Sequence, residues 1–188
     1  MERCKVFHEG AFFRNLNLGR PRCPTRQQFE QSFVEAGASE AASFLTSGTI
    51  AFEARSAGSA KRILARARKS MRDSSGLEEP AFLREFAYLQ RLVAADPFVA
   101  IDRSAVYDCY VTFLHDDVVA ARGLPPSSPR GDVELIQFTG SEALCVAHKL
   151  AKSPGSPNAF VEKTLALPAT TRAWNTVVRL VAKHGLEG

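Results

Sequence analysis

Arginine and asparagine side chains gather between a predicted first strand and a predicted first helix. Residues 12–25 read FFRNLNLGRPRCPT, and their hydrogen-bond donors include Arg14 and Asn17, close to a turn at Gly19. A guanidinium at the end of a strand, near a helix N-terminus, is typical of phosphate or carboxylate binding. In the alternative interpretation, these polar side chains hold the loop together by hydrogen bonds to its own backbone.

The C-terminal segment is a second candidate anion site. Residues 170–185, TTRAWNTVVRLVAKHG, predict a helix with apolar residues at helical spacing and a threonine as its N-cap. Arg172 would lie in the first turn, with Asn175 and Thr176 on another face than the apolar residues. A guanidinium beside free backbone N–H groups can hold an anion. The alternative is that Arg172 binds carbonyls or a carboxylate of the chain itself.

Residues 58–72, GSAKRILARARKSMR, predict an amphipathic helix whose apolar stripe is flanked by basic residues on both sides. The expected buried stripe comprises Ala60, Ile63, Leu64, Ala67 and Met71. The basic residues that flank it are Lys61, Arg62, Arg66, Arg68, Lys69 and Arg72. No acidic residue occurs from 54 to 72, and residues 1–72 carry 13 Lys or Arg against 6 Asp or Glu. This pattern indicates contact with phosphates, or a solvated helix whose long side chains cover the edge of the core.

Other chemistries leave no recognisable motif. The chain lacks the glycine-rich fingerprints of dinucleotide and P-loop sites. The four cysteines, at 4, 23, 109 and 145, are far apart, and none has a histidine at metal-ligand spacing. We therefore predict reduced, mostly buried thiols, no metal and no cofactor. No group of catalytic residues with a known spacing is recognisable in the sequence, so the question of enzymatic activity is left open.

Composition and hydrophobic pattern define the class of protein. Apolar residues make up 45% and charged residues 23%, as in ordinary globular proteins. No apolar run approaches the roughly 20 residues that span a bilayer, and no secretory signal is visible at the start. These features predict a cytoplasmic protein that does not enter a membrane.

The order of the elements predicts an α+β fold. Residues 1–98 are expected to form a ferredoxin-like β-α-β-β-α-β unit, and residues 99–188 a second, smaller α+β subdomain that ends on a helix. The predicted strands of the first unit are 5–13, 42–46, 49–54 and EPAFLREF at 79–86. Ser47-Gly48 is expected to join the second and third of these strands as a tight hairpin. The predicted strands of the second unit are 106–114 and those near 133–138 and 142–148. A helix is expected to begin at Thr25 in the first unit, where Thr-x-x-Gln is a capping-box pattern, and another is expected over 158–165 in the second.

Four stretches occur together in an order that resembles a bacterial family called domain of unknown function 1697. They are FFRNLNLG, SFLTSGTIAFEA, YVTFLHD and TTRAWNTVVRL. The resemblance covers nearly the whole chain and implies ferredoxin-like subunits, but it supplies no activity. The chain departs from the family pattern at Asn15, Thr49 and Ala173, where glycine, asparagine and asparagine are usual. The amides expected at positions 49 and 173 are therefore missing.

Three classes of function remain open. The first, which we rank ahead, is nucleic-acid binding by the basic helix and the N-terminal arginines. The second is an enzyme or binder for a small phosphorylated or carboxylated ligand, held where two segments meet in space. Those segments carry Arg14, Asn17 and Gly19, and Arg172, Asn175 and Thr176. The third is an interaction or oligomerisation module in which the arginines pair with carboxylates.

Overall fold

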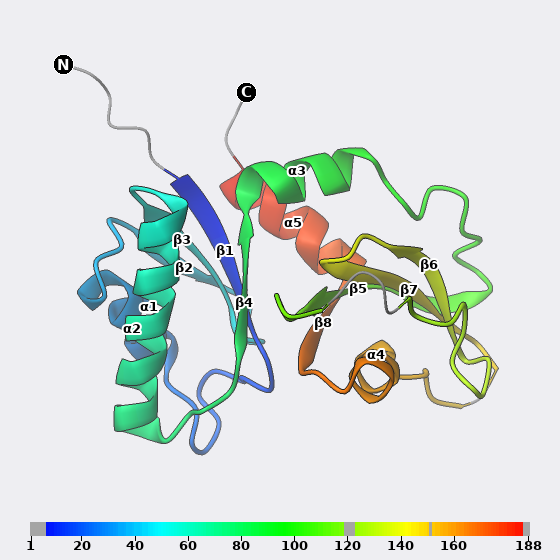
Figure 1. Cartoon of the computed structure of the whole chain (residues 1–188), viewed down its shortest axis with the longest axis horizontal. Helices are drawn as coiled ribbons and strands as arrows, with labels where there is room; N and C mark the ends of the chain where they lie inside the picture. Colours follow the sequence, from blue (N-terminus) through cyan, green and yellow to red (C-terminus); the bar gives the residue numbers. More distant parts are fainter. Residues whose placement is uncertain (1–6, 119–122, 151, 186–188) are drawn as a thin grey trace. The chain divides into compact units, whose positions relative to one another are not determined.

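The computed structural model describes residues 7–118, 123–150 and 152–185. In this part of the chain, five helices and two four-stranded antiparallel sheets form a mixed α+β protein (Figure 1), which confirms the predicted class. The chain divides into two compact units: residues 1–89 with 184–188 form unit 1, and residues 90–183 form unit 2. The predicted boundary after residue 98 stays a prediction. Residues 4–6, which include a cysteine and the start of the predicted first strand, lie outside the described residues.

Unit 1 follows the ferredoxin-like order that the sequence predicts. Its elements are β1 (Phe7–Phe13), α1 (Arg26–Glu35), β2 (Ala41–Phe44), β3 (Thr49–Ala54), α2 (Ala57–Ser75) and β4 (Ala81–Glu85). The strands pair in the order β2-β3-β1-β4, and every pair is antiparallel. The two central strands are thus the first and the third along the chain, so each helix crosses over the sheet.

Local signals fix the ends of both helices. The side chain of Thr25 accepts a hydrogen bond from the Gln28 backbone, and the Gln28 side chain accepts one in return. This is the predicted capping box, and Ser56 and Ser59 form a second one at the start of α2. Gly76 ends α2 in the left-handed conformation, with φ +73°.

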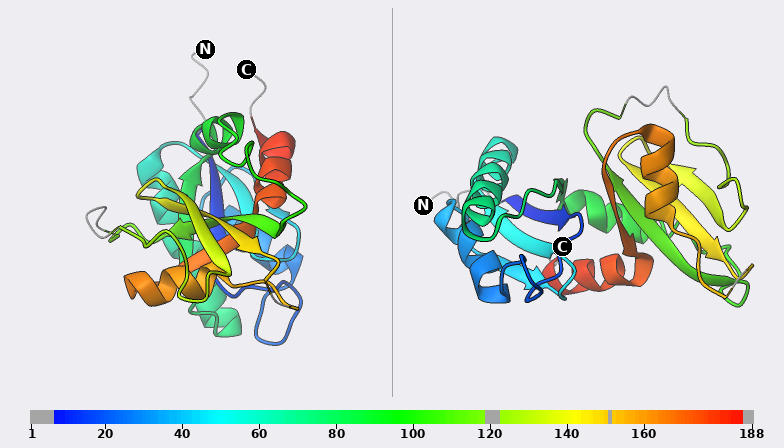
Figure 2. Two further views of the ribbon diagram at one scale, coloured as in Figure 1. Left: turned by 90° about the vertical axis from the view of Figure 1, so that its right-hand side faces the viewer. Right: turned by 90° about the horizontal axis from the view of Figure 1, so that it is seen from below.

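The two helices pack on the same side of the sheet (Figure 2). Aromatic rings of the core fill the space between the helices and the strands. The ring of Phe13 from β1 meets that of Phe29 from α1 edge to face, with centroids 5.2 Å apart. Phe33 and Phe52 continue the cluster at 5.0 Å. The buried residues of α2 are the predicted ones, namely Ala60, Ile63, Leu64, Ala67 and Met71. Burial of this stripe leaves the basic side of α2 to solvent.

Unit 2 has the strand order of unit 1. Its strands are β5 (Val106–Leu114), β6 (Val133–Phe138), β7 (Glu142–His148) and β8 (Ala169–Ala173), and its helix α4 spans Pro157–Leu165. The order β6-β7-β5-β8 matches β2-β3-β1-β4 position by position. The described residues between β5 and β6 contain no helix where unit 1 has α1. In its described residues, unit 2 therefore follows the ferredoxin-like strand order without a helix at the place of α1.

A helix follows the last strand in each unit. The helix α3 (Phe86–Ala94) begins directly after β4, and α5 (Trp174–His184) begins directly after β8. The prediction that the last helix starts near residue 170 is wrong. Thr171 and Arg172 belong to β8 and pair with Thr112 and Val111 of β5. Consecutive threonines suit an extended backbone, and the pairing with β5 satisfies it.

Candidate functional site

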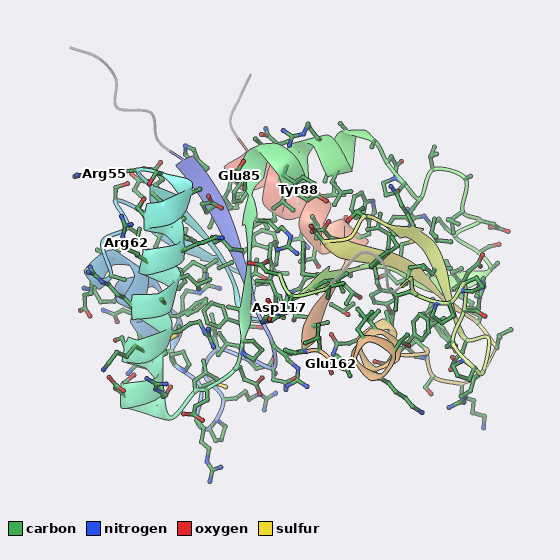
Figure 3. All side chains as sticks on the ribbon, viewed as in Figure 1. Arg55, Arg62, Glu85, Tyr88, Asp117 and Glu162 are labelled. Atoms are coloured by element: carbon green, nitrogen blue, oxygen red, sulfur yellow. The ribbon has the colours of Figure 1, made fainter. Side chains whose placement is uncertain are left out.

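The predicted basic helix presents its cations to solvent. We call the exposed residues of this side the basic face of α2: Lys61, Arg62, Arg66, Lys69 and Arg72. Arg68 is half-buried, as expected of a long side chain that covers the edge of a core. Arg55, also exposed, lies with Arg62 near the start of the helix (Figure 3). Positions 62, 66 and 69 are four and three residues apart, so their side chains follow one another along one stripe.

A carboxylate partly neutralises the C-terminal end of this face. Lys69 Nζ donates to Asp73 Oδ2 at 2.5 Å, and Arg72 Nε lies 4.0 Å from Asp73 Oδ1. The hydrogen bond from Lys69 is the main reason why the pKa of Asp73 lies below its ordinary value. Lys61 and Arg66 have no hydrogen bond or ion pair to any residue that the structure describes, and the same holds for Arg62. The first half of the face thus retains uncompensated charge.

The other face of the unit 1 sheet does not offer aromatic rings for base stacking. Phe12, Phe44 and Phe82 point to the side away from α1 and α2, and all three are buried. A Cβ atom on Gly10, at the centre of this face, would lie 3.5 Å from Leu89 Cδ1. The ferredoxin-like modules that read RNA expose aromatic rings on their sheet. Nucleic-acid contact in unit 1 would therefore rest on phosphates.

The opening segment places its donors on a carboxylate of the chain. Arg14 Nη1 donates to Glu79 Oε2 at 3.0 Å, and Asn15 Nδ2 donates to Glu79 Oε1 at 3.1 Å. Asn17 is exposed, and its carbonyl accepts a hydrogen bond from the Arg20 backbone at 3.1 Å. Gly19 has φ +79° and donates its N–H to the Pro24 carbonyl. These contacts within unit 1 agree with the alternative in which the polar side chains of the loop bind groups of the chain itself.

Arg172 lies on a strand and is buried. Its Nη1 atom donates to Thr170 Oγ1 at 2.8 Å and to the Thr171 carbonyl at 2.9 Å. Burial lowers the pKa of the guanidinium to about 10, so it is still protonated at pH 7. In the helix that follows, Asn175 is exposed and Thr176 half-buried. Arg14 belongs to unit 1 and Arg172 to unit 2, so the hypothesis that their segments meet stays a prediction.

The equivalent strand of unit 1 carries a second buried arginine, which the sequence reasoning missed. Arg84 of β4 pairs with Gly10 of β1, and Arg172 of β8 pairs in the same way with Val111 of β5. Its Nη1 atom donates to the carbonyl of the preceding residue, Leu83, at 2.6 Å. The signal was an arginine two residues before an aromatic helix start, in REF and again in RAW. Recognising it requires knowing that the two units share one strand order.

Membrane crossing by a helix finds no support in the described ranges. None of the helices there is both long enough and apolar enough to span a bilayer.

Comparison with known proteins places the chain in a family. A solved structure, of a conserved bacterial protein from Streptococcus pneumoniae called SP0830, shares the fold with a TM-score of 0.61. The alignment covers 95% of this chain and 98% of the other at 14% identity. No curated protein sequence matches the chain. The family model described as protein of unknown function (DUF1697) matches residues 10–143. The chain belongs to the DUF1697 family, as the sequence motifs predict.

Proposed function

We propose that the chain binds nucleic acid through the basic face of α2. The observation that carries this proposal is the group of exposed cations Lys61, Arg62 and Arg66, to which the structure assigns no carboxylate among the described residues. A rigid helix holds these charges at a fixed spacing, because the opposite stripe of the helix is buried in the core. Positions 62 and 69 are seven residues apart, which separates them by roughly 10 Å along the axis.

The expected binding mode is contact with the phosphate backbone and little sequence preference. Half or more of the hydrogen bonds in protein–DNA complexes go to phosphate and sugar, and these contacts do not read the bases. Burial of the sheet aromatics Phe12, Phe44 and Phe82 supports the same expectation for single strands. A cytoplasmic location, where RNA and DNA are accessible, is part of this proposal.

The salt dependence of the affinity follows from the number of phosphates that the basic face of α2 neutralises. Three contacts predict that log K falls with log salt at a slope of about −2.7 for duplex DNA. Affinity should then fall by roughly 40-fold between 50 and 200 mM salt. Fluorescence anisotropy of labelled single- and double-stranded oligonucleotides measures both the affinity and the slope.

A charge-reversal pair tests the location of the contacts. The variant Arg62→Glu/Arg66→Glu should lose binding at 50 mM salt and reduce the slope by about 2. The matched control is Lys152→Glu/Lys163→Glu, which makes the same change in net charge at exposed positions of unit 2. Equal losses in the two variants would show that net charge, and not the basic face of α2, attracts the nucleic acid.

Absence of binding at 50 mM salt would contradict the proposal. The two other classes of function would then be tested directly. Saturable stabilisation by phosphate or citrate, abolished by Arg14→Gln, would favour a small anionic ligand. A mass that increases with protein concentration, without any such stabilisation, would favour an oligomerisation module.

A further inference from the structure

A cavity of about 190 Å³ lies in unit 1, on the face of the sheet that α1 and α2 leave uncovered. Small residues form its floor, because Ala42 of β2 pairs with Ala51 of β3, and Ala51 pairs with Gly10 of β1. Three neighbouring strands thus carry alanine or glycine in one row. Protein interiors are otherwise closely packed, so a hollow at this place requires such a row of small side chains.

Carboxylates and imidazoles form the rim of this cavity. The next row of the sheet brings His8 of β1 opposite Glu53 of β3, and the backbone N–H of Glu53 donates to the carbonyl of Glu40 at 3.0 Å. Phe86, at the start of α3, and His184 also line the cavity, and their ring centroids are 6.3 Å apart. Among the residues that the structure describes, none of those lining the cavity is a lysine or an arginine.

The carboxylate of Glu53 is held in place and still has room to accept a hydrogen bond. Ser39 Oγ donates to its Oε2 atom at 2.9 Å, which fixes one oxygen. The Oε1 atom lies 3.7 Å from His8 Nε2, a distance longer than a hydrogen bond. The side chain of Glu53 is one-quarter exposed. A ligand in the cavity can therefore donate to Oε1.

The residues that line the cavity also indicate which kind of ligand it can bind. The basic side chains that the described lining places beside its two carboxylates are imidazoles, not lysine or arginine. This balance favours a cation, and the face of an aromatic ring attracts one as well. The alanine floor offers apolar contact for a short carbon chain. Because one water molecule takes about 30 Å³ of liquid, the volume suits a ligand of roughly six to ten non-hydrogen atoms.

We propose that this cavity binds a small organic amine. Its ammonium group donates to Glu53 and is attracted by Glu40, while its carbon chain lies over Ala42 and Ala51 against Phe86. This site is independent of the basic face of α2, which lies on the other side of the sheet in the same unit. No motif of the sequence indicates this site, because its residues come from five separate segments.

Isothermal titration and thermal shift at 0.15 M salt test the proposal with four named probes: n-butylamine, 2-phenylethylamine, 1-butanol and butyrate. The two amines should bind saturably and raise Tm, whereas the alcohol and the carboxylate should do neither. Glu53→Gln keeps the shape of the site and removes its charge, and it should weaken amine binding at least tenfold. The control Glu35→Gln changes an exposed carboxylate at the end of α1 and should leave binding unchanged.

A space-filling variant examines the position of the site. Ala51→Leu should abolish amine binding by occupying the floor. If it does not fold, amide shifts in the wild-type protein on titration with 2-phenylethylamine take its place, and they should be largest at His8, Ala51 and Glu53. The proposal is overturned if neither amine binds below 10 mM, if 1-butanol binds as well as n-butylamine, or if Glu53→Gln binds like the wild type. Amide shifts centred elsewhere would also overturn it.

Discussion

Replacing the buried carboxyl of Glu9 by a neutral group should stabilise the protein at neutral pH and should have little effect on stability at acidic pH. Glu9 lies in the middle of the unit 1 sheet, between Phe52 of β3 and Glu85 of β4, on the face that α1 and α2 cover. Its side chain is almost fully buried. Burial, with a smaller contribution from the charge of Glu85, raises its pKa from 4.5 to about 7. The folded state therefore prefers the protonated form.

The pKa difference gives both the sign and the size of the effect. Below pH 4.5, Glu9 is protonated in the folded and in the unfolded chain, so its contribution to stability is fully present. As the pH rises toward 7, the unfolded chain releases the proton and the folded chain retains it, and this contribution is lost. A difference between 4.5 and about 7 corresponds to about 3 kcal/mol. Above pH 7 the loss is complete and stays constant.

The variant Glu9→Gln isolates this effect, because an amide has the shape of a protonated carboxyl and does not titrate. Urea denaturation of both proteins between pH 4.5 and 8 gives the difference in free energy of unfolding. Glu9→Gln should be within about 0.5 kcal/mol of the wild type at pH 4.5 and more stable by about 3 kcal/mol at pH 8.

Two control variants identify the cause. Glu85→Gln removes only the repulsion, so its gain at pH 8 should be smaller than that of Glu9→Gln. Glu35→Gln, at an exposed position, should show no pH-dependent gain. A difference between wild type and Glu9→Gln that does not change with pH, or a Glu9→Gln variant that is less stable at pH 8, would refute the reasoning.

Three further predictions concern stability and reactivity. Gly48→Ala should lower the free energy of unfolding, measured by urea denaturation, by about 1–3 kcal/mol more than Gly76→Ala does. Both glycines have φ near +70°, but only at Gly48 would a Cβ atom lie 2.6 Å from a leucine side chain. Equal losses in the two variants would show that this leucine can move away. Burial raises the pKa of Cys145 to about 12. In the folded protein at pH 8, iodoacetamide should therefore leave Cys145 unmodified and should label the half-buried Cys23. Peptide mapping that finds both cysteines labelled would contradict this prediction. Thr25→Ala removes the capping box of α1 and should lower the free energy of unfolding by about 1 kcal/mol, whereas an unchanged Tm would show that the cap contributes nothing.

The sequence by itself determined the elements whose signals lie within a few residues. The capping box at Thr25 and the stripe from Ala60 to Met71 are local patterns with helical period, and the structure has both where the sequence predicts them. The turn at Gly48 likewise joins the two strands of a hairpin. Such signals survive in a single sequence because the interacting residues are neighbours along the chain. Their order was sufficient to predict the ferredoxin-like plan of unit 1.

Tertiary structure alone decided how distant residues are paired. The partner of Arg14 is Glu79, 65 positions away, and no local pattern connects the two. Arg172 lies on a strand and not in a helix, because β5 supplies backbone partners that outweigh the helical spacing after Trp174. The common strand order of the two units depends on which strands pair, and the row of small residues under the cavity at Ala51 depends on their register. Register depends on which faces are buried together in the folded chain, and that information is not contained in any one segment.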